Sequence, residues 1–194
     1  MTQSFDILIV GIGGQGTILA SNILGKACLL EGRHVKGAET HGMAQRGGSV
    51  ESHIRIDGQF GPLIVPGGAD LLISFDLLEA LRYSHYLKRG GKMVVNRHLV
   101  LPTSVFTQKI AAPTEEEIIA KLSVHDLCLL DADTIAAEAG SVLAQNVVML
   151  GAAAGSMPLS PDSLVAAVRS LVPPKTIDVN TKAFEMGREL GGKC

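Results

Sequence analysis

Cysteine is scarce in this 194-residue chain, and the three cysteines, Cys28, Cys128 and Cys194, are far apart in the sequence. No C-x-x-C pair is present, so the chain lacks the closely spaced thiolates that an iron–sulfur cluster or a structural zinc ion requires. Cys28 and Cys128 lie in apolar stretches, which predicts inert thiols in the core. An odd number of widely separated cysteines is typical of a reducing compartment, so we expect a cytoplasmic protein.

The chain also lacks a strong net charge and a long apolar run. Its formal net charge is -2, which gives no global attraction to nucleic acid or to an anionic membrane. The longest uncharged stretch, 139–161, is interrupted by polar residues and indicates a buried helix rather than a membrane span. The apolar run 7–10 is too short for a signal peptide. We therefore expect neither nucleic acid nor a membrane as a partner.

No internal repeat or flexible linker divides the chain, so we expect one domain over residues 1–194. Short apolar runs bounded by turn residues recur at 5–10, 71–75, 93–96 and 127–131. Each run is too short for a helix and lacks polar alternation, as in strands that are buried on both faces of a parallel sheet.

Helix patterns lie between these runs. Three pairs of residues have the spacing of a helix start: Asp76 with Glu79, Thr114 with Glu117, and Ser160 with Pro161. The alternation of strands and helices predicts an α/β fold, namely a three-layer, doubly wound, mostly parallel sheet of the Rossmann-like kind.

Two segments depart from this alternation of strands and helices. The segment 47–57 alternates apolar and polar residues and resembles a strand with one solvent-exposed face. The segment 61–68 is rich in glycine and proline and is expected to form a loop. We interpret both as a small β insertion after the second strand, beside the switch point of the sheet.

The sharpest motif is Gly11-Ile12-Gly13-Gly14-Gln15-Gly16, which follows the first apolar run and opens a helix. This is G-x-G-x-x-G in the strand-to-helix context where glycines let backbone N–H groups reach a phosphate. The alternative interpretation is that these glycines only close the turn and let the helix pack on the strand. A dinucleotide enzyme would also place an acid about 20 residues further on. Glu39 lies at that distance, but in a polar segment, which weakens the NAD interpretation.

The second motif is the segment 36–48, which is dense in polar groups and contains His41, Gln45 and Arg46 ahead of Gly47 and Gly48. An arginine beside two glycines can present its guanidinium to a carboxylate or phosphate while the backbone approaches closely. We expect this loop to contact a ligand or another subunit. The alternatives are that Arg46 pairs with a surface acid and that His41 is simply exposed.

The remaining polar residues do not predict a catalytic group. Asp131 and Asp133 are expected to be a helix N-cap and a first-turn acid. The six histidines show no metal-ligand spacing, so no metal site is predicted. The small residues 151–155 predict close helix packing.

The two motifs resemble those of the gamma-type subunits of the 2-oxoacid:ferredoxin oxidoreductases, and most closely those of the indolepyruvate branch. The resemblance covers almost the whole chain. It is carried by 9–16, by 39–50 and, more loosely, by 173–175 and 180–184. The motif His-Gly-Met-Ala-Gln-Arg-Gly-Gly is similar to the indolepyruvate branch in particular.

This resemblance implies an accessory subunit that is inactive alone. Thiamine diphosphate, magnesium and 4Fe-4S clusters would lie on a larger partner, ferredoxin would accept the electrons, and coenzyme A would accept the acyl group. The residues carried over as active-site or interface positions are Gly11, Gly13, Gly14, Gln15, Gly16, His41, Gln45, Arg46, Gly47 and Gly48.

Other interpretations stay open at this point. The chain could be a self-contained NAD(P)-dependent oxidoreductase or a non-catalytic nucleotide-binding scaffold. The 2-oxoacid could be pyruvate, a branched-chain acid or 2-oxoglutarate, and the isolated chain could form a homodimer through the uncharged stretch 139–161.

Overall fold

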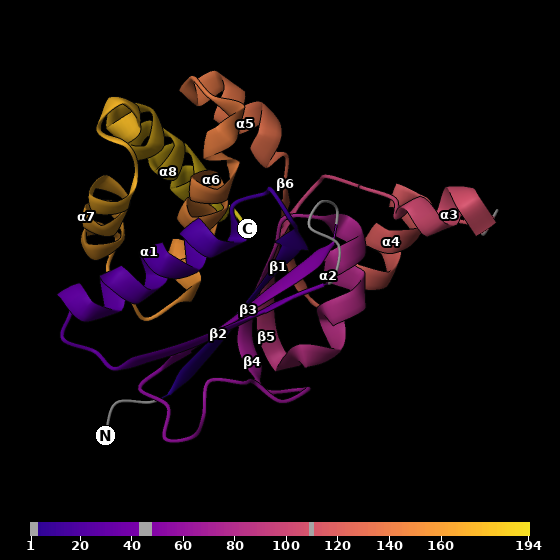
Figure 1. Ribbon diagram of the computed structural model, residues 1–194, viewed down its shortest axis with the longest axis horizontal. Coiled ribbons are helices and arrows are strands. Elements are labelled where there is room, and N and C mark those ends of the chain that lie inside the picture. Colours follow the sequence, from indigo (N-terminus) through magenta and orange to yellow (C-terminus); the bar gives the residue numbers. More distant parts are fainter. Residues whose placement is uncertain (1–3, 43–47, 109–110) are drawn as a thin grey trace.

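The computed structural model describes residues 4–42, 48–108 and 111–194 (Figure 1). Six strands form one sheet in the order β2-β3-β1-β4-β5-β6. Their bounds are β1 Phe5–Ile12, β2 Val35–His41, β3 Ser49–Ile56, β4 Ala69–Ser74, β5 Leu87–Asn96 and β6 Asp126–Leu130. β3 pairs antiparallel with both of its neighbours, β1 and β2, while β1, β4, β5 and β6 pair in parallel. The predicted mostly parallel α/β sheet is confirmed.

Helices lie on both faces of the sheet (Figure 1). One face carries α1 (Thr17–Leu30), α5 (Ala132–Ala139), α6 (Gln145–Ala153), α7 (Pro161–Leu171) and α8 (Ile177–Gly191). The other face carries α2 (Leu77–Tyr83) and α4 (Glu115–Leu122), preceded by α3 (Thr103–Gln108). Short 3-10 turns, η1 (Ser84–Tyr86), η2 (Val142–Ala144), η3 (Ala154–Ser156) and η4 (Pro174–Thr176), link these elements.

Two apolar cores explain why the strand runs lack polar alternation. Ile7 and Ile9 of β1 pack in the core beneath α1 and α6, whereas Leu8 and Val10 pack in the core beneath α2 and α4. Successive side chains of a strand point to opposite faces, so a strand covered on both sides needs apolar residues at every position. All four of these side chains are fully buried.

The predicted helix starts are largely confirmed. Thr114 and Glu117 form a reciprocal capping box at α4, and Ser160 accepts a hydrogen bond from the backbone N–H of Ser163 at 3.1 Å. Asp76 caps α2 by accepting from the backbone N–H groups of Leu78 and Glu79. The side chain of Glu79, however, accepts a hydrogen bond from Ser49 of β3. The predicted return contact from Glu79 to the start of α2 is therefore wrong.

β3 differs from the expected strand with a solvent-exposed face. Arg55 and His53 are buried, because the loop after β3 covers them. Arg55 forms a two-pronged ion pair with Asp6, with both N–O distances at 2.9 Å. His53 accepts a hydrogen bond from the backbone N–H of Ile64 at 3.1 Å. The strand also lies inside the sheet, between β2 and β1, and not beside it.

The second motif, the segment 36–48, is expected to be a loop, but its first part is a strand. Residues Val35–His41 form β2 at the open edge of the sheet, and most of their side chains are exposed. An edge strand that packs on one side only needs few apolar residues, so its sequence does not stand out as a buried strand.

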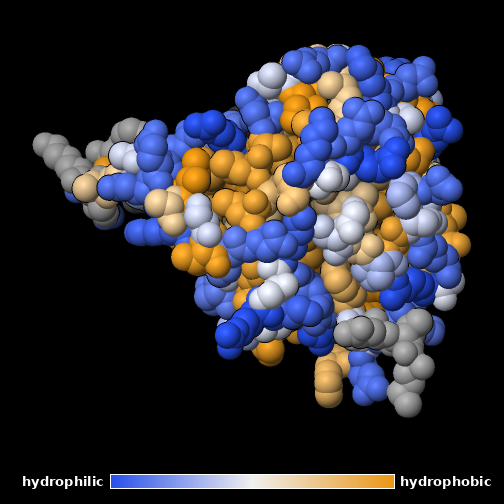
Figure 2. All heavy atoms as spheres, turned by 180° about the vertical axis from the view of Figure 1, so that it is seen from behind, coloured by the Kyte–Doolittle hydropathy of each residue, from blue (hydrophilic) through white to orange (hydrophobic). Residues whose placement is uncertain are grey.

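The uncharged stretch 139–161 is explained by burial within the chain. It contains α6, in which residues 146–153 are all buried, largely against α8. In the turn before α6, Val142 and Leu143 are exposed, so a homodimer through this part of the stretch stays a prediction. Within the described ranges no helix has the length and apolar character to cross a membrane, and the rear surface mixes hydrophilic and hydrophobic residues (Figure 2).

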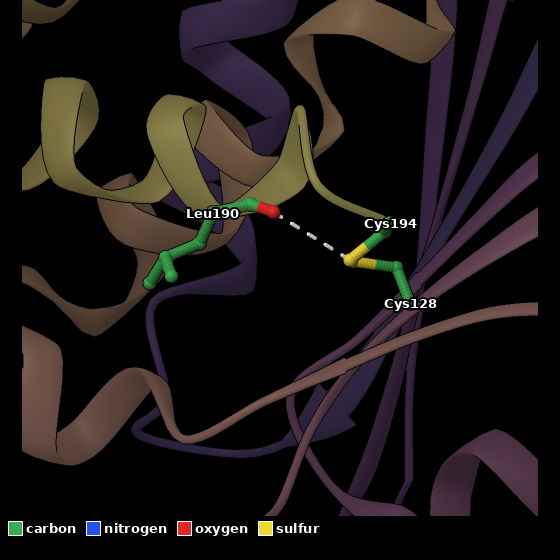
Figure 3. Close-up of a disulfide and its surroundings, with 3 residues drawn as sticks. All are labelled: Cys128, Leu190 and Cys194. Carbon is green, nitrogen blue, oxygen red and sulfur yellow. Dashed lines mark hydrogen bonds between the residues drawn. A yellow bond between two sulfur atoms is a disulfide. The ribbon is translucent and has the colours of Figure 1, made fainter.

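The prediction of free core thiols for Cys28 and Cys128 is wrong for Cys128. Cys128 of β6 forms a disulfide with Cys194, which follows α8, across 66 residues of sequence (Figure 3). The Sγ of Cys194 also lies 3.7 Å from the carbonyl oxygen of Leu190. Cys28 is a free, buried thiol, and burial raises its pKa to about 11. Sequence alone did not reveal the pair, because no local spacing connects β6 with the end of α8.

Candidate functional site

The glycine turn, residues 11–16, joins β1 to α1 at the carboxyl edge of the parallel strands. Gly14 and Gly16 have φ angles of 105° and 82°, in the left-handed region that favours glycine. Gly16 is also the N-cap of α1, and it has no side chain with which to cap the helix. The first-turn N–H groups of a helix lack partners within the helix, so this end of α1 offers donors to an anion.

Gln15 has a different place from the one expected of a ligand-facing residue. Its Oε1 accepts a hydrogen bond from the backbone N–H of Ile12 at 2.7 Å, and its Nε2 donates to the carbonyl of Phe75 at 3.3 Å. The side chain therefore ties the end of β1 to the end of β4. A Cβ at Gly11 would lie 2.8 Å from this Oε1, so Gly11 makes room for Gln15.

Asn146, in the first turn of α6, supports the glycine turn, and no pattern in the sequence predicts this role. Its Nδ2 donates a hydrogen bond to the carbonyl of Gly16 at 3.2 Å, and the side chain is buried. A Cβ at Gly16 would lie 2.7 Å from the same nitrogen. The two residues are 130 positions apart, so only the packing of α6 on α1 brings them together.

A cavity of about 530 Å³ opens beside the glycine turn. It brings together four of the predicted positions, Gly13, Gly14, Gly16 and His41, and it is completed by Thr17, Ile18, Gly42 and Val50. The backbone N–H of Gly13 donates to the carbonyl of Gly48 at 2.9 Å. That donor is therefore already used, and the donors left to an anion come from the start of α1 rather than from the whole turn.

The second motif is only partly within the described residues. Gln45, Arg46 and Gly47 lie outside them, so their predicted contacts stay predictions. At the two described ends, Gly42 donates its backbone N–H to the carbonyl of Ser49 at 2.9 Å, and Gly48 accepts from Gly13. Both ends are thus held at the cavity by the backbone of β3 and of the glycine turn.

Behind Ser49 lies a polar cluster that sequence reasoning missed. The hydroxyl of Ser49 donates to the carboxylate of Glu79 and lies 3.1 Å from the hydroxyl of Tyr83. Burial raises the pKa of Glu79, an effect that the Ser49 hydrogen bond and the Arg82 guanidinium oppose. Burial likewise raises the pKa of Tyr83. The cluster fixes the start of β3 against α2, and so supports one wall of the cavity from behind.

A second row of polar contacts continues along the same edge to α5. Asn96 donates to the carbonyl of Phe75 at 3.5 Å and to Asp133 at 3.3 Å, and its Oδ1 accepts from Ala132 at 2.9 Å. His98 lies 2.8 Å from the Asp133 carboxylate. These contacts link the ends of β4, β5 and β6.

The acids of this edge serve as helix caps. Asp131 accepts from the backbone N–H of Thr134 at 3.0 Å, which confirms the predicted N-cap, and Asp133 is the first-turn acid. Burial raises the pKa of Asp76, against its hydrogen bonds from Val100 and the start of α2. In the described part of the chain, no three His, Cys, Asp or Glu side chains are grouped to hold a metal ion. The edge can hold an anionic ligand, and its side chains form a supporting framework.

Comparison with known proteins shows what this arrangement is similar to. The family model described as pyruvate ferredoxin/flavodoxin oxidoreductase matches residues 6–190. Indolepyruvate oxidoreductase subunit IorB of Archaeoglobus fulgidus is 42% identical over 186 residues, covering 94% of this chain and 92% of the relative. The 2-oxoglutarate synthase subunit KorC of Methanothermobacter thermautotrophicus is 29% identical over 187 residues, covering 95% and 94%.

A solved structure gives the same picture. The crystal structure of a keto/oxoacid ferredoxin oxidoreductase gamma subunit from Geobacter sulfurreducens superposes with a TM-score of 0.72 at 27% sequence identity. The likeness covers 98% of this chain and 99% of that one. The whole fold is therefore shared, including the carboxyl edge that carries the glycine turn.

Proposed function

Because the chain belongs to the pyruvate ferredoxin/flavodoxin oxidoreductase family, we propose that it is the small accessory subunit of a 2-oxoacid ferredoxin oxidoreductase that acts on indolepyruvate or related aryl pyruvates. The observation that carries this proposal is the 42% identity to an indolepyruvate oxidoreductase subunit over nearly the whole length of both chains. Identity to the 2-oxoglutarate synthase subunit is lower, at 29%, which favours the aryl pyruvate branch.

The reaction is the oxidative decarboxylation of a 2-oxoacid to an acyl-CoA, with electrons passing to ferredoxin. Thiamine diphosphate with magnesium would supply the decarboxylation, and 4Fe-4S clusters would carry the electrons. In the described chain Cys128 and Cys194 are joined and Cys28 is buried, so its thiols do not fit a cluster site. We therefore assign these cofactors to a larger partner subunit.

The part of this chain would be to help shape the coenzyme A region. The cavity beside the glycine turn has a helix N-terminus with unused donors and an exposed imidazole, His41, at its rim. Both features suit the phosphates of a nucleotide. We propose that the chain acts as one domain. Its place in the cytoplasm is likewise a proposal, which rests on the family alone, because the Cys128–Cys194 disulfide removes the argument from free thiols. Gly14, Gly16 and His41 would face the ligand, while Gly11, Gly13, Gln15 and Gly48 hold the turn.

A self-contained NAD-dependent enzyme of Rossmann type fits the structure less well. In that fold the acid that holds the ribose lies on the strand next to β1. Here β3 separates β1 from β2, which places Glu39 two strands away, roughly 10 Å across the sheet. The Glu39 carboxylate also accepts a hydrogen bond from Ser21 at 2.8 Å.

Reconstitution with the large subunit tests the proposal. The purified chain alone is expected to catalyse no indolepyruvate-dependent reduction of ferredoxin. Mixing it with the product of the neighbouring thiamine- and cluster-bearing reading frame is expected to restore that reduction, in a reaction that requires coenzyme A. Oxoacid turnover or saturable NADH binding by the chain alone would contradict the assignment.

His41→Ala is expected to raise the KM for coenzyme A of the reconstituted enzyme by about tenfold, since a hydrogen bond to a charged group contributes about 1.5–3 kcal/mol. The side chain is half exposed, so the melting temperature should not change. His34→Ala is the matched control, because His34 is exposed just before β2 and does not line the cavity. An unchanged KM for coenzyme A would remove His41 from the ligand site.

A further inference from the structure

The loop between β3 and β4, at the amino edge of the sheet, carries three large exposed apolar side chains. Phe60, Leu63 and Val65 are 76%, 60% and 66% exposed, and we call these three residues the apolar tip. Between them Ile64 is buried in the core beneath α2 and holds the loop on the sheet. Exposed apolar side chains gathered on one short segment mark an interaction surface more often than single ones do.

The backbone of this loop is fixed by side chains from the strands beneath it. Lys36 of β2 donates to the carbonyls of Gln59 and Phe60, at 3.3 and 2.8 Å, and Arg55 of β3 donates to the carbonyl of Gly61 at 2.9 Å. Three consecutive carbonyls are thus satisfied by cations. An apolar surface on a fixed backbone loses little conformational entropy when it binds, which favours affinity.

The charges around the tip have one sign at the surface. The three acids that flank the loop are each paired within the chain: Asp6 with Arg55, Asp57 with Arg33, and Asp70 with Lys88. Their side chains are only 13%, 9% and 14% exposed. Cations remain at the surface, namely Lys36 and Arg89, with Lys88 partly exposed.

Arg89 lies next to the loop because the start of β5 lies beside the end of the loop in the sheet. Ala69, the first residue of β4, pairs with Leu87, and Gly67 donates its backbone N–H to the carbonyl of His85 at 3.0 Å. The amino edge therefore presents an apolar tip with a positively charged rim, on the side of the sheet opposite the glycine turn.

We propose that the apolar tip docks into an apolar, acid-rimmed pocket of the larger, thiamine- and cluster-bearing subunit. This inference rests on the proposed function, which supplies that partner. A second copy of this chain is a poorer fit, because a symmetric contact would bring the positively charged rims of the two copies together. A membrane is a poorer fit as well, because anionic lipid surfaces are recognised by clusters of about four to eight cations.

The test measures the Kd between this chain and the purified large subunit. Phe60→Asp is expected to weaken binding at least about thirtyfold, since a buried aromatic anchor is typical of an interface hot spot. Val124→Asp is the matched control, because Val124 is 80% exposed beside β6, at the far end of the sheet, and its Kd should not change. Both variants should keep the wild-type melting temperature. Arg89→Glu is expected to weaken binding most at low salt.

The outcomes separate the two proposals. If the wild-type chain binds the large subunit and Phe60→Asp binds equally well, the docking site is wrong and the proposed function stands. If wild-type chain and large subunit do not associate at all, both fail. Self-association of the chain that Phe60→Asp abolishes, or Phe60-dependent sedimentation with phosphatidylserine-containing vesicles, would also overturn the assignment of the tip to the large subunit.

Discussion

Gly187→Ala is expected to lower the free energy of unfolding by at least about 3 kcal/mol, which is the upper part of the range for overpacked cores. A Cβ at Gly187 would lie 2.1 Å from the carbonyl oxygen of Val148 and 2.9 Å from its carbonyl carbon. Both atoms belong to the backbone of α6, which cannot turn aside as a side chain would. The change should appear as a melting temperature lower by roughly 6–12 °C.

The same contact recurs along the crossing of α6 and α8. A Cβ at Gly151 would lie 2.1 Å from the carbonyl oxygen of Phe184, and one at Gly191 would lie 2.1 Å from that of Ala152. The two helix backbones therefore touch. The small residues 151–155 predict close packing, and the structure confirms this at Gly151, whereas a Cβ at Gly155 would meet open space.

Gly25→Ala is the matched control for Gly187→Ala. Gly25 also lies inside a helix, α1, but nothing stands within 4 Å of a Cβ there. Alanine is a better helix former than glycine by about 1 kcal/mol, so this variant should be more stable than the wild type. If both variants lose the same stability, the loss would come from something other than the crossing of α6 and α8.

The crossing also bears on the cavity, because the first turn of α6 carries Asn146, the residue that supports the glycine turn. Asn146 holds the carbonyl of Gly16, and α8 holds α6 in place. We therefore expect a displaced α6 to loosen the turn. This route from α8 to Gly16 is a property of packing, and no spacing in the sequence indicates it.

Which parts of the site can be predicted depends on how far apart in the sequence the contacting residues are. The glycine turn, the strand before it and the helix after it follow from neighbouring residues, and they are found as predicted. The inward position of Gln15 depends on Phe75, 60 residues away, and the burial of Arg55 depends on Asp6, 49 residues away. A local pattern classifies such side chains as exposed, because their partners are not local.

The place of β3 shows the same limit at the level of topology. Its alternating residues predict a strand, but not that the strand enters the sheet between β1 and β2. The position of β3 is determined by its backbone hydrogen bonds to β1 and β2, which lie at different distances from it along the chain. Local patterns therefore indicate the function less strongly than the family resemblance does, and only the folded chain distinguishes the residues that line the cavity from those that support it.

Cys194→Ser is expected to lower the free energy of unfolding by about 4 kcal/mol, because the Cys128–Cys194 disulfide closes a loop of 66 residues. A crosslink over this distance removes much of the entropy of the unfolded chain. It also ties the end of α8 to β6, where Cys128 is buried. Urea unfolding without reductant should show the variant's midpoint well below that of the wild type.

Reductant provides the control for this prediction. Dithiothreitol should lower the stability of the wild type to that of Cys194→Ser and leave the variant unchanged, since the variant has no disulfide to lose. Unfolded, unreduced wild-type protein should react with one equivalent of a thiol reagent, at Cys28. Three reactive thiols would show that Cys128 and Cys194 are not joined, and α8 would then be held only by its packing on α5, α6 and α7.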